Sequence, residues 1–298
     1  MKSYQGKTAV ITGAGSGFGL EVARLAAARG MNLVLCDVQA DALEKAAAEL
    51  SAVPVLALRV DVAKAAEMEA LAVAVQQRFG APNFVFNNAG VGSGGLIWEN
   101  TLADWEWVMG VNVMGVVHGV RLFTPMMLAA AAADPKFEGH IVNTASMAGM
   151  VNAPNMGVYN VSKHAVVSLS ETLHQDLALV TEQVRCSLLC PFFVPTGISQ
   201  SHRNRPGELA AAKPTKSQLV SQAMSDKAVS AGKVTAAEVA AMVFAAMDAG
   251  QFYVFSHPKS LASVQTRLED VMQLRNPTDP FKDKPELGAQ ITALLKGD

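Results

Sequence analysis

The amino-acid sequence predicts an α/β fold, a doubly wound parallel sheet with helices on both faces. Apolar residues make up 50% of the 298 residues and charged residues 17%, so the chain can bury a large core. From residue 7 to about residue 190, short β-branched runs alternate with Ala-rich stretches of helical periodicity. A series of strand, helix and strand implies right-handed crossovers, and these make the strands parallel.

The elements follow in order along the chain. Short apolar runs predict strands at residues 8–12, 32–36, 55–60, 83–86, 140–144, 185–189 and 251–255. Apolar residues at three- and four-residue spacing predict helices at about 17–29, 39–50, 64–79, 102–132, 157–182, 235–248 and 261–274.

The remaining length is predicted to be a lid and a tail. Residues 197–232 are rich in Ser, Gln, Lys, Ala and Pro with weak periodicity, which is typical of a long lid or binding loop. After the helix at 261–274 come the breakers Pro277 and Pro280. A chain of this length could form two domains. Because the last strand follows the lid, we expect one domain over residues 1–256 and a helical extension over 257–298.

The composition excludes several function classes. With 24 basic and 26 acidic side chains, the protein has no field that would attract nucleic acid or an anionic membrane. Glycines interrupt the first apolar run, so it is no signal peptide, and we expect a cytoplasmic protein. The cysteines and histidines show no metal-ligand spacing, so we expect no metal site; the residues are Cys36, Cys186, Cys190, His118, His140, His164, His174, His202 and His257.

A glycine-rich turn after the first strand is a candidate phosphate site. Its glycines let the backbone approach a pyrophosphate, whose charge would be met by amide groups at the start of the following helix. A tight turn with a purely structural role is the alternative. The turn comprises Gly13, Gly15, Ser16, Gly17, Phe18 and Gly19.

Asp37 at the end of the second strand strengthens the phosphate interpretation. It lies 20 residues beyond Gly17, where a carboxylate accepts hydrogen bonds from an adenosine ribose and repels a 2′-phosphate. Neither Ser16 nor Val38 supplies a cation for such a phosphate. The sequence therefore predicts NAD in preference to NADP.

A tyrosine and a lysine share one helix face further along the chain. Tyr159 precedes Lys163 by four residues. Ser146 lies 13 residues before the tyrosine, just after a predicted strand. A free tyrosine has a pKa of about 10 and is a poor base at neutral pH, so it needs a nearby cation. Lys163 is that candidate cation.

These residues together resemble the motifs of the short-chain dehydrogenase/reductase family, from about residue 5 to residue 256. The resemblance implies a Rossmann fold with a seven-stranded parallel sheet, and hydride transfer between a nicotinamide and an alcohol or carbonyl carbon. It also implies homodimers or homotetramers built on the helices at 102–132 and 157–182.

The resemblance implies roles residue by residue. Tyr159 would be the general acid and base, Ser146 would hold the substrate oxygen, and Lys163 would lower the tyrosine's pKa and bind the nicotinamide ribose. Asn112 would hold a water that links Lys163 to solvent. Further cofactor contacts would come from Asp61, Val62, Asn88, Ala89, Gly90, Pro191, Val194 and Thr196.

One residue departs from the family pattern. Phe192 stands after Pro191 where the family usually has glycine, which puts the backbone path beneath the nicotinamide in doubt. The substrate contacts predicted around it are Ser146, Met147, Tyr159, Phe192 and Phe193. They favour an apolar secondary alcohol or ketone, with bulky and aromatic compounds among the candidates.

Two alternatives stay open. Cations in the lid, Arg203, Arg205, Lys213 and Lys216, could instead serve a 3-oxoacyl-thioester reductase with an acidic or acyl-carrier substrate. The chain could also be a dinucleotide-sensing scaffold that keeps the fold for binding alone.

Overall fold

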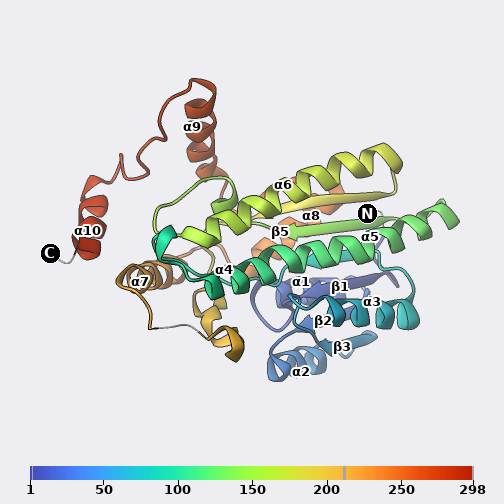
Figure 1. Cartoon of the computed structure of the whole chain (residues 1–298). Helices are drawn as coiled ribbons and strands as arrows, with labels where there is room; N and C mark the ends of the chain where they lie inside the picture. Colours follow the sequence, from blue (N-terminus) through green and yellow to red (C-terminus); the bar gives the residue numbers. More distant parts are fainter. Residues whose placement is uncertain (2, 211–212, 297–298) are drawn as a thin grey trace.

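The computed structural model describes residues 1, 3–210 and 213–296. It confirms a seven-stranded parallel sheet with the strand order β3-β2-β1-β4-β5-β6-β7 (Figure 1). The strands are β1 (Thr8–Thr12), β2 (Asn32–Asp37), β3 (Val55–Arg59), β4 (Phe84–Asn87), β5 (Gly139–Thr144), β6 (Val184–Cys190) and β7 (Tyr253–Phe255). The order reverses between β1 and β4, and ligands of such sheets bind outside the carboxyl ends at this point.

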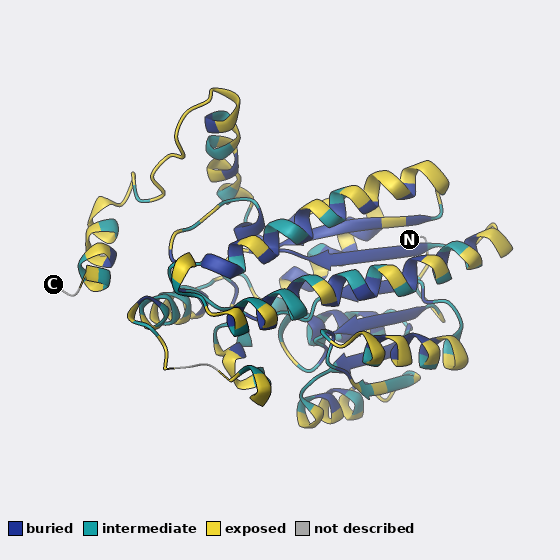
Figure 2. Ribbon diagram, viewed as in Figure 1, coloured by how far each residue is buried: buried dark blue, intermediate teal, exposed yellow. Residues whose placement is uncertain are grey.

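Helices cover both faces of the sheet, and the strands between them are buried (Figure 2). Alternate residues of β1 point to opposite faces, with Ile11 in one core cluster and Val10 in the other. One face packs against α1 (Gly17–Ala28), α2 (Ala40–Glu49) and α8 (Ala236–Ala249). The other packs against α3 (Ala65–Phe79), α5 (Gly115–Ala133) and α6 (Gly157–Val180).

The single long helix predicted at 102–132 is divided in the structure. It consists of α4 (Leu102–Met109), a π-helical turn over Gly110–Met114, and α5. By length and composition alone, Leu102–Ala133 is apolar enough to cross a membrane, with a mean hydropathy of 1.4 over its best window. In the structure α5 packs along β4 and β5, which accounts for one apolar side of this stretch.

The prediction of an irregular lid is wrong over residues 216–230. Residues 197–204 and 207–209 form short 3-10 turns, but Lys216–Ser230 form the helix α7. This helix lacks a clear apolar stripe because Ser, Gln and Lys occupy much of its surface. It begins at Thr215, whose side chain and that of Gln218 form a capping box. Residues 211–212 of the predicted lid lie outside the described residues.

The tail contains one helix more than predicted. Beyond α9 (Leu261–Met272), residues 273–284 lead away from the sheet to α10 (Pro285–Lys296), which packs against α7 (Figure 1). The helix α9 already ends at Met272, five residues before Pro277, and Leu274 beyond its cap has a φ of +54°. Pro285 occupies the first turn of α10, where a missing N–H costs nothing.

Candidate functional site

A cavity of about 390 Å³ lies at the carboxyl edge of the sheet, on both sides of the reversal point between β1 and β4. Most of the residues predicted from the sequence line it: Gly13, Ser16, Gly17, Phe18, Asp37, Asp61, Val62, Asn88, Ala89, Gly90, Ser146, Met147, Tyr159, Lys163, Pro191, Phe192, Phe193, Val194 and Thr196. Gly15, Gly19 and Asn112 are not part of its lining. Gly15 and Asn112 form hydrogen bonds with the lining residues Asp37 and Val91, and Gly19 lies against Gly13.

The glycine-rich turn leaves room only for glycine at its closest approaches. A Cβ on Gly19 would lie 2.0 Å from the carbonyl oxygen of Gly13, and Gly13 itself has a φ of +66°. Within the described chain, Ser16 precedes α1 without capping it through its side chain, and the first turn carries no acidic residue. The amide groups at this helix end are therefore available to an anion, which fits a pyrophosphate.

Asp37 is held in place by backbone amides on both of its oxygens. Oδ2 accepts a hydrogen bond from the Gly15 amide at 2.9 Å, and Oδ1 accepts one from the Gln39 amide at 2.9 Å. Val38 and Gln39, which are uncharged, line the cavity beside it. This surrounding fits the two hydroxyls of a ribose.

Ser146, Tyr159 and Lys163 lie together in the lining of the cavity. The Ser146 hydroxyl accepts a hydrogen bond from the Ala148 amide at 3.1 Å and donates one to the Pro191 carbonyl at 3.4 Å. Lys163 Nζ donates to the Thr144 carbonyl at 3.0 Å and lies 5.8 Å from the centroid of the Tyr159 ring. The helix α6 thus brings the phenol and the ammonium to one side of the serine, as their spacing predicts.

Burial is the dominant influence on the pKa of both titratable groups. It raises the pKa of Tyr159, while the hydrogen bond with Ser146 acts in the opposite direction. It lowers the pKa of Lys163 to about 8, with Cys190 opposing that shift. Burial therefore opposes the lowering of the tyrosine's pKa that was expected from the lysine.

Asn112 joins the loop after β4 to the helix that carries the tyrosine. Its Oδ1 accepts from the Val91 amide at 2.8 Å, and its Nδ2 donates to the Val91 carbonyl and to Ser162 Oγ, both at 3.0 Å. Ser162 in turn donates to the Tyr159 carbonyl at 2.8 Å. Both amide hydrogens of Asn112 are therefore used, and a water linked to Lys163 would have to use other atoms.

The residue that departs from the family pattern is accommodated without strain. Asn155 and Leu274 are the non-glycine residues of positive φ among those described, so Phe192 does not need the backbone freedom of glycine. The Phe192 amide donates to Ser256 Oγ at 2.9 Å, and its ring lies 4.4 Å from that of Phe193. The two rings form an aromatic wall of the cavity.

Sequence reasoning missed the contribution of α7 to the cavity. Polar side chains of this helix, Ser221, Gln222 and Ser225, line it together with Trp107 of α4. The Thr215-x-x-Gln218 capping box is the sequence signal that could have placed the helix. Met150, near Met147 in the chain, does not line the cavity and packs against the core cluster that includes Val166 and Val167 of α6. Among the described residues, no group of His, Cys, Asp and Glu side chains could hold a metal ion.

Comparison with known proteins places this site in a family. The model of the short chain dehydrogenase family matches residues 7–207. A short chain dehydrogenase/reductase from Burkholderia phymatum, solved in complex with NAD, is 50% identical with a TM-score of 0.91, covering 94% of this chain and 99% of that one. The CLA biosynthesis dehydrogenase/reductase of Lactiplantibacillus plantarum is 31% identical over 280 residues, 91% of this chain and 95% of that protein. A C alpha-dehydrogenase of a Sphingobium species is 34% identical over 211 residues, 70% of this chain and 67% of that protein.

Proposed function

Since the chain belongs to the short-chain dehydrogenase family of oxidoreductases, we propose that it is an NAD-dependent enzyme acting on the CH–OH group of an apolar secondary alcohol, or on the corresponding ketone. The observation that carries the proposal is the shared cavity in which Ser146, Tyr159 and Lys163 lie beside the glycine-rich turn and Asp37. When bound, the nicotinamide accepts or returns the hydride.

The side chains of the site would handle the proton and the substrate oxygen. In the oxidation, the substrate hydroxyl donates its proton to the Tyr159 phenolate while its carbon loses the hydride, and Ser146 holds the oxygen. In the reduction, the phenol returns the proton to that oxygen. Lys163 provides positive charge beside the phenolate and would bind the nicotinamide ribose. Asn112 fixes the first turn of α6 through Ser162.

The preference for NAD rests on Asp37 and its surroundings. Its carboxylate lies where the adenosine ribose is expected and has uncharged neighbours in the cavity wall. The similar chain from Burkholderia phymatum carries NAD in its structure, which supports the same cofactor here.

The apolar wall favours an uncharged, bulky or aromatic substrate. Phe192, Phe193 and Met147 line the cavity beside Ser146. The 3-oxoacyl-thioester alternative is weakened because Arg205, one of the lid cations it requires, is engaged in a buried ion pair with Asp104. The sensor alternative gives no chemical role to Ser146, Tyr159 and Lys163.

We further propose a cytoplasmic enzyme with one catalytic domain over residues 1–256, the lid at 197–232 and the extension at 257–298. It would act on a small molecule, without nucleic acid or membrane as partner. The exposed apolar side chains Leu102, Met114 and Val161 on α4, the π-helical turn and α6 favour a homodimer or homotetramer. Light scattering after gel filtration measures the mass of the assembly and so distinguishes a dimer from a tetramer.

The deciding experiment follows NADH formation at 340 nm with NAD and a panel of aliphatic, aryl and 3-hydroxyacyl-thioester substrates. The Tyr159→Phe variant is expected to lose at least a thousandfold in kcat, because the ring stays while the proton acceptor is removed. Tyr253→Phe is the matched control, since that hydroxyl donates to Glu171 away from the cavity.

Each outcome of the panel has a distinct meaning. Turnover that survives in Tyr159→Phe would refute the proposed mechanism. Activity confined to thioesters would favour the acyl reductase, and tight NADH binding without turnover of any substrate would favour the sensor.

A further inference from the structure

The first half of the lid crosses the entire cofactor crevice. Segment 197–209 starts beside Thr196, after β6, and its Glu208 reaches Lys64, after β3, at 3.6 Å. In the sheet order, β1, β2, β4 and β5 lie between these two strands. Ile198, Ser201 and Leu209 of the segment line the cavity. A dinucleotide bound along the glycine-rich turn, Asp37 and Asp61 would therefore lie beneath it.

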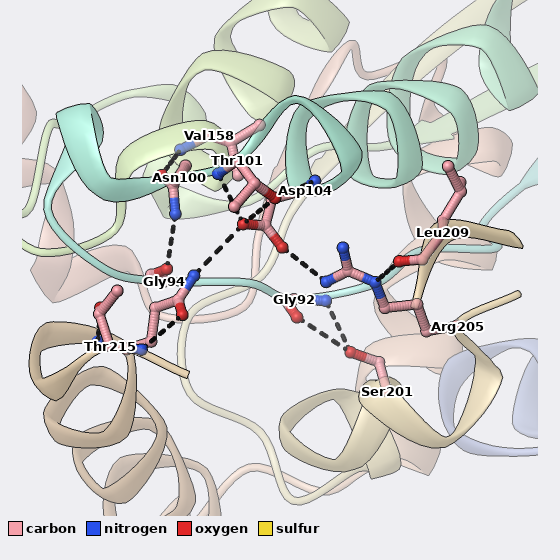
Figure 3. A network of polar contacts seen from close by, with 11 residues as sticks. Gly92, Gly94, Asn100, Thr101, Asp104, Val158, Ser201, Arg205, Leu209 and Thr215 are labelled. Carbon is pink, nitrogen blue, oxygen red and sulfur yellow. Dashed lines mark hydrogen bonds and ion pairs between the residues drawn. The ribbon is translucent and has the colours of Figure 1, made fainter. Parts of the chain in front are cut away.

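The contacts between the segment and the body of the protein differ in burial. Ser201, which is buried, accepts from the Gly92 amide at 2.8 Å and donates to the Gly92 carbonyl at 3.2 Å (Figure 3). Arg205 Nη1 donates to Asp104 Oδ1 at 2.5 Å, with the side chains 11% and 4% exposed. The Lys64–Glu208 pair is exposed and contributes little.

Asp104 joins the two halves of the lid to the body of the protein. While Oδ1 binds Arg205, Oδ2 accepts from the Thr101 amide at 2.8 Å and from Gln218 Nε2 of α7 at 3.3 Å. Figure 3 shows the carboxylate between α4 and Arg205. One side chain at the start of α4 thus contacts both segment 197–209 and α7.

The environment makes this ion pair sensitive to any change in either partner. Burial would raise the pKa of Asp104, but hydrogen bonds from Arg205 and Thr101 outweigh it and hold the pKa below its ordinary value. The guanidinium lies 5.2 Å from the Trp107 ring, and its Nη2 is buried without a partner among the described residues. Removing one charge would leave the other buried and unpaired, which strongly favours opening of the lid.

We propose that Asp104 and Arg205 are positioning residues that latch segment 197–209 over the bound dinucleotide, so that opening of this ion pair gates release of the cofactor. The proposal rests on the NAD-dependent function proposed above. The latch acts on closure of the crevice and takes no part in the chemical step.

The test compares Asp104→Asn, Arg205→Met and the double variant with the unaltered protein. The dissociation rate constant of NADH is measured by stopped-flow fluorescence with excess NAD as competitor. Each single variant is expected to release NADH at least tenfold faster. The double variant is expected to release it no faster than the singles, because both changes open the same latch.

The matched control separates the latch from loss of a helix cap. Glu238 forms the same kind of capping box with Thr235 at the start of α8. Its carboxylate accepts a hydrogen bond from the Thr235 amide at 2.7 Å. Glu238→Gln is therefore expected to change the NADH dissociation rate less than twofold. Arg205→Met leaves the capping box of Thr101 and Asp104 intact. This variant therefore tests the latch even if Asp104→Asn folds poorly.

A second readout keeps this test independent of the proposed function. Trypsin can cut after Arg203 in segment 197–209 and after Lys216 at the start of α7, in addition to Lys227 within α7, whereas Arg205 and Lys213 precede proline; the first two sites are followed. Without any ligand, both single variants are expected to be cut at these sites at least fivefold faster than the unaltered protein. Unchanged cleavage and unchanged NADH release in Arg205→Met would overturn the latch. Failure of all proteins to bind NADH would refute the proposed function, and the cleavage rates would still decide the latch.

Discussion

Lys163 shows how a single functional side chain costs stability. The residue is 3% exposed, and among the described residues its ammonium has one hydrogen bond, to the Thr144 carbonyl. Burial lowers its pKa from 10.5 to about 8. A shift of this size corresponds to roughly 3 kcal/mol by which folding disfavours the charged form. The fold thus retains a costly cation beside Tyr159, which is what a proton-transfer site requires.

A stability measurement can test this cost directly. Lys163→Met should abolish most activity yet unfold at an equal or higher Tm at pH 7, because the apolar side chain removes the buried charge and loses one hydrogen bond. Since the folded pKa is lowered, the unfolded chain binds the extra proton between about pH 8 and pH 10.5. The penalty is complete below pH 8 and vanishes towards pH 10.5, so the advantage of Lys163→Met should shrink as pH rises. Urea unfolding at pH 7 and pH 9.5 measures the difference in stability between the variant and the unaltered protein. A variant that is clearly less stable at pH 7 would contradict the prediction.

Asp37 permits a prediction on cofactor choice. In Asp37→Asn the side chain keeps its size but loses the charge that favours ribose hydroxyls and repels a 2′-phosphate. The value of kcat/KM with NAD should fall about tenfold or more, because one charge-assisted hydrogen bond contributes about this much. The ratio of NADP activity to NAD activity should rise. Asp41→Asn is the control, since that carboxylate is 80% exposed on α2. Equal losses with both cofactors would show that the carboxylate does not discriminate.

At the scale of the element, the π-helical turn between α4 and α5 has a definite structural consequence. Its wider turn breaks the regular hydrogen-bond ladder, with the Gly115 amide bonded to the Gly110 carbonyl. Asn112 in this turn is fully buried and bonded to both backbone groups of Val91. The turn thereby couples the loop after β4 to the start of α6.

The coupling predicts unequal effects of two neighbouring substitutions. Asn112→Ala leaves the buried Val91 amide and carbonyl unsatisfied and should lower the free energy of unfolding by about 3 kcal/mol. Ser162→Ala removes the bond to Asn112 but leaves Val91 paired, and should cost about 1 kcal/mol. Urea titrations of both variants measure the difference, and equal losses would show that Val91 does not depend on Asn112.

The elements differ in how far the sequence determines them. The strands and α1 could be predicted because buried parallel strands are continuous apolar runs and the glycine-rich turn marks the junction. Position 110 could not be predicted as a π turn, because the apolar period continues through it. The helix α7 was missed because few apolar residues recur at helical spacing along it, and its Thr215-x-x-Gln218 capping box is a short local signal. The Asp104–Arg205 pair joins residues 101 positions apart, beyond the reach of any local pattern.

At the scale of the whole molecule, the tail and the lid form one structural unit. The cofactor site could be predicted because its residues follow successive strands, and the strand order brings them to one edge. The tail gave no such signal, since α10 has its partner in a lid helix that was itself not predicted. Its contact with α7 links the C-terminal extension to the wall of the cavity that holds Ser221 and Ser225.

This link predicts that a change in α10 alters substrate binding from outside the cavity. Ile291 is the buried residue of α10, with 6% of its surface exposed. Leu294 on the same helix is 53% exposed. Ile291→Asp places an unpaired charge in the buried position and should detach α10, so that α7 loses support and KM for the alcohol rises about fivefold or more. The KM for NAD should change less, because segment 197–209 is anchored separately through Arg205 and Ser201. Leu294→Asp introduces the same charge in an exposed position and should leave both constants unchanged within twofold. Steady-state kinetics of the two variants separate the outcomes: equal KM values would show that α10 does not support the lid, whereas a parallel rise in both constants would show that the two halves of the lid move as one.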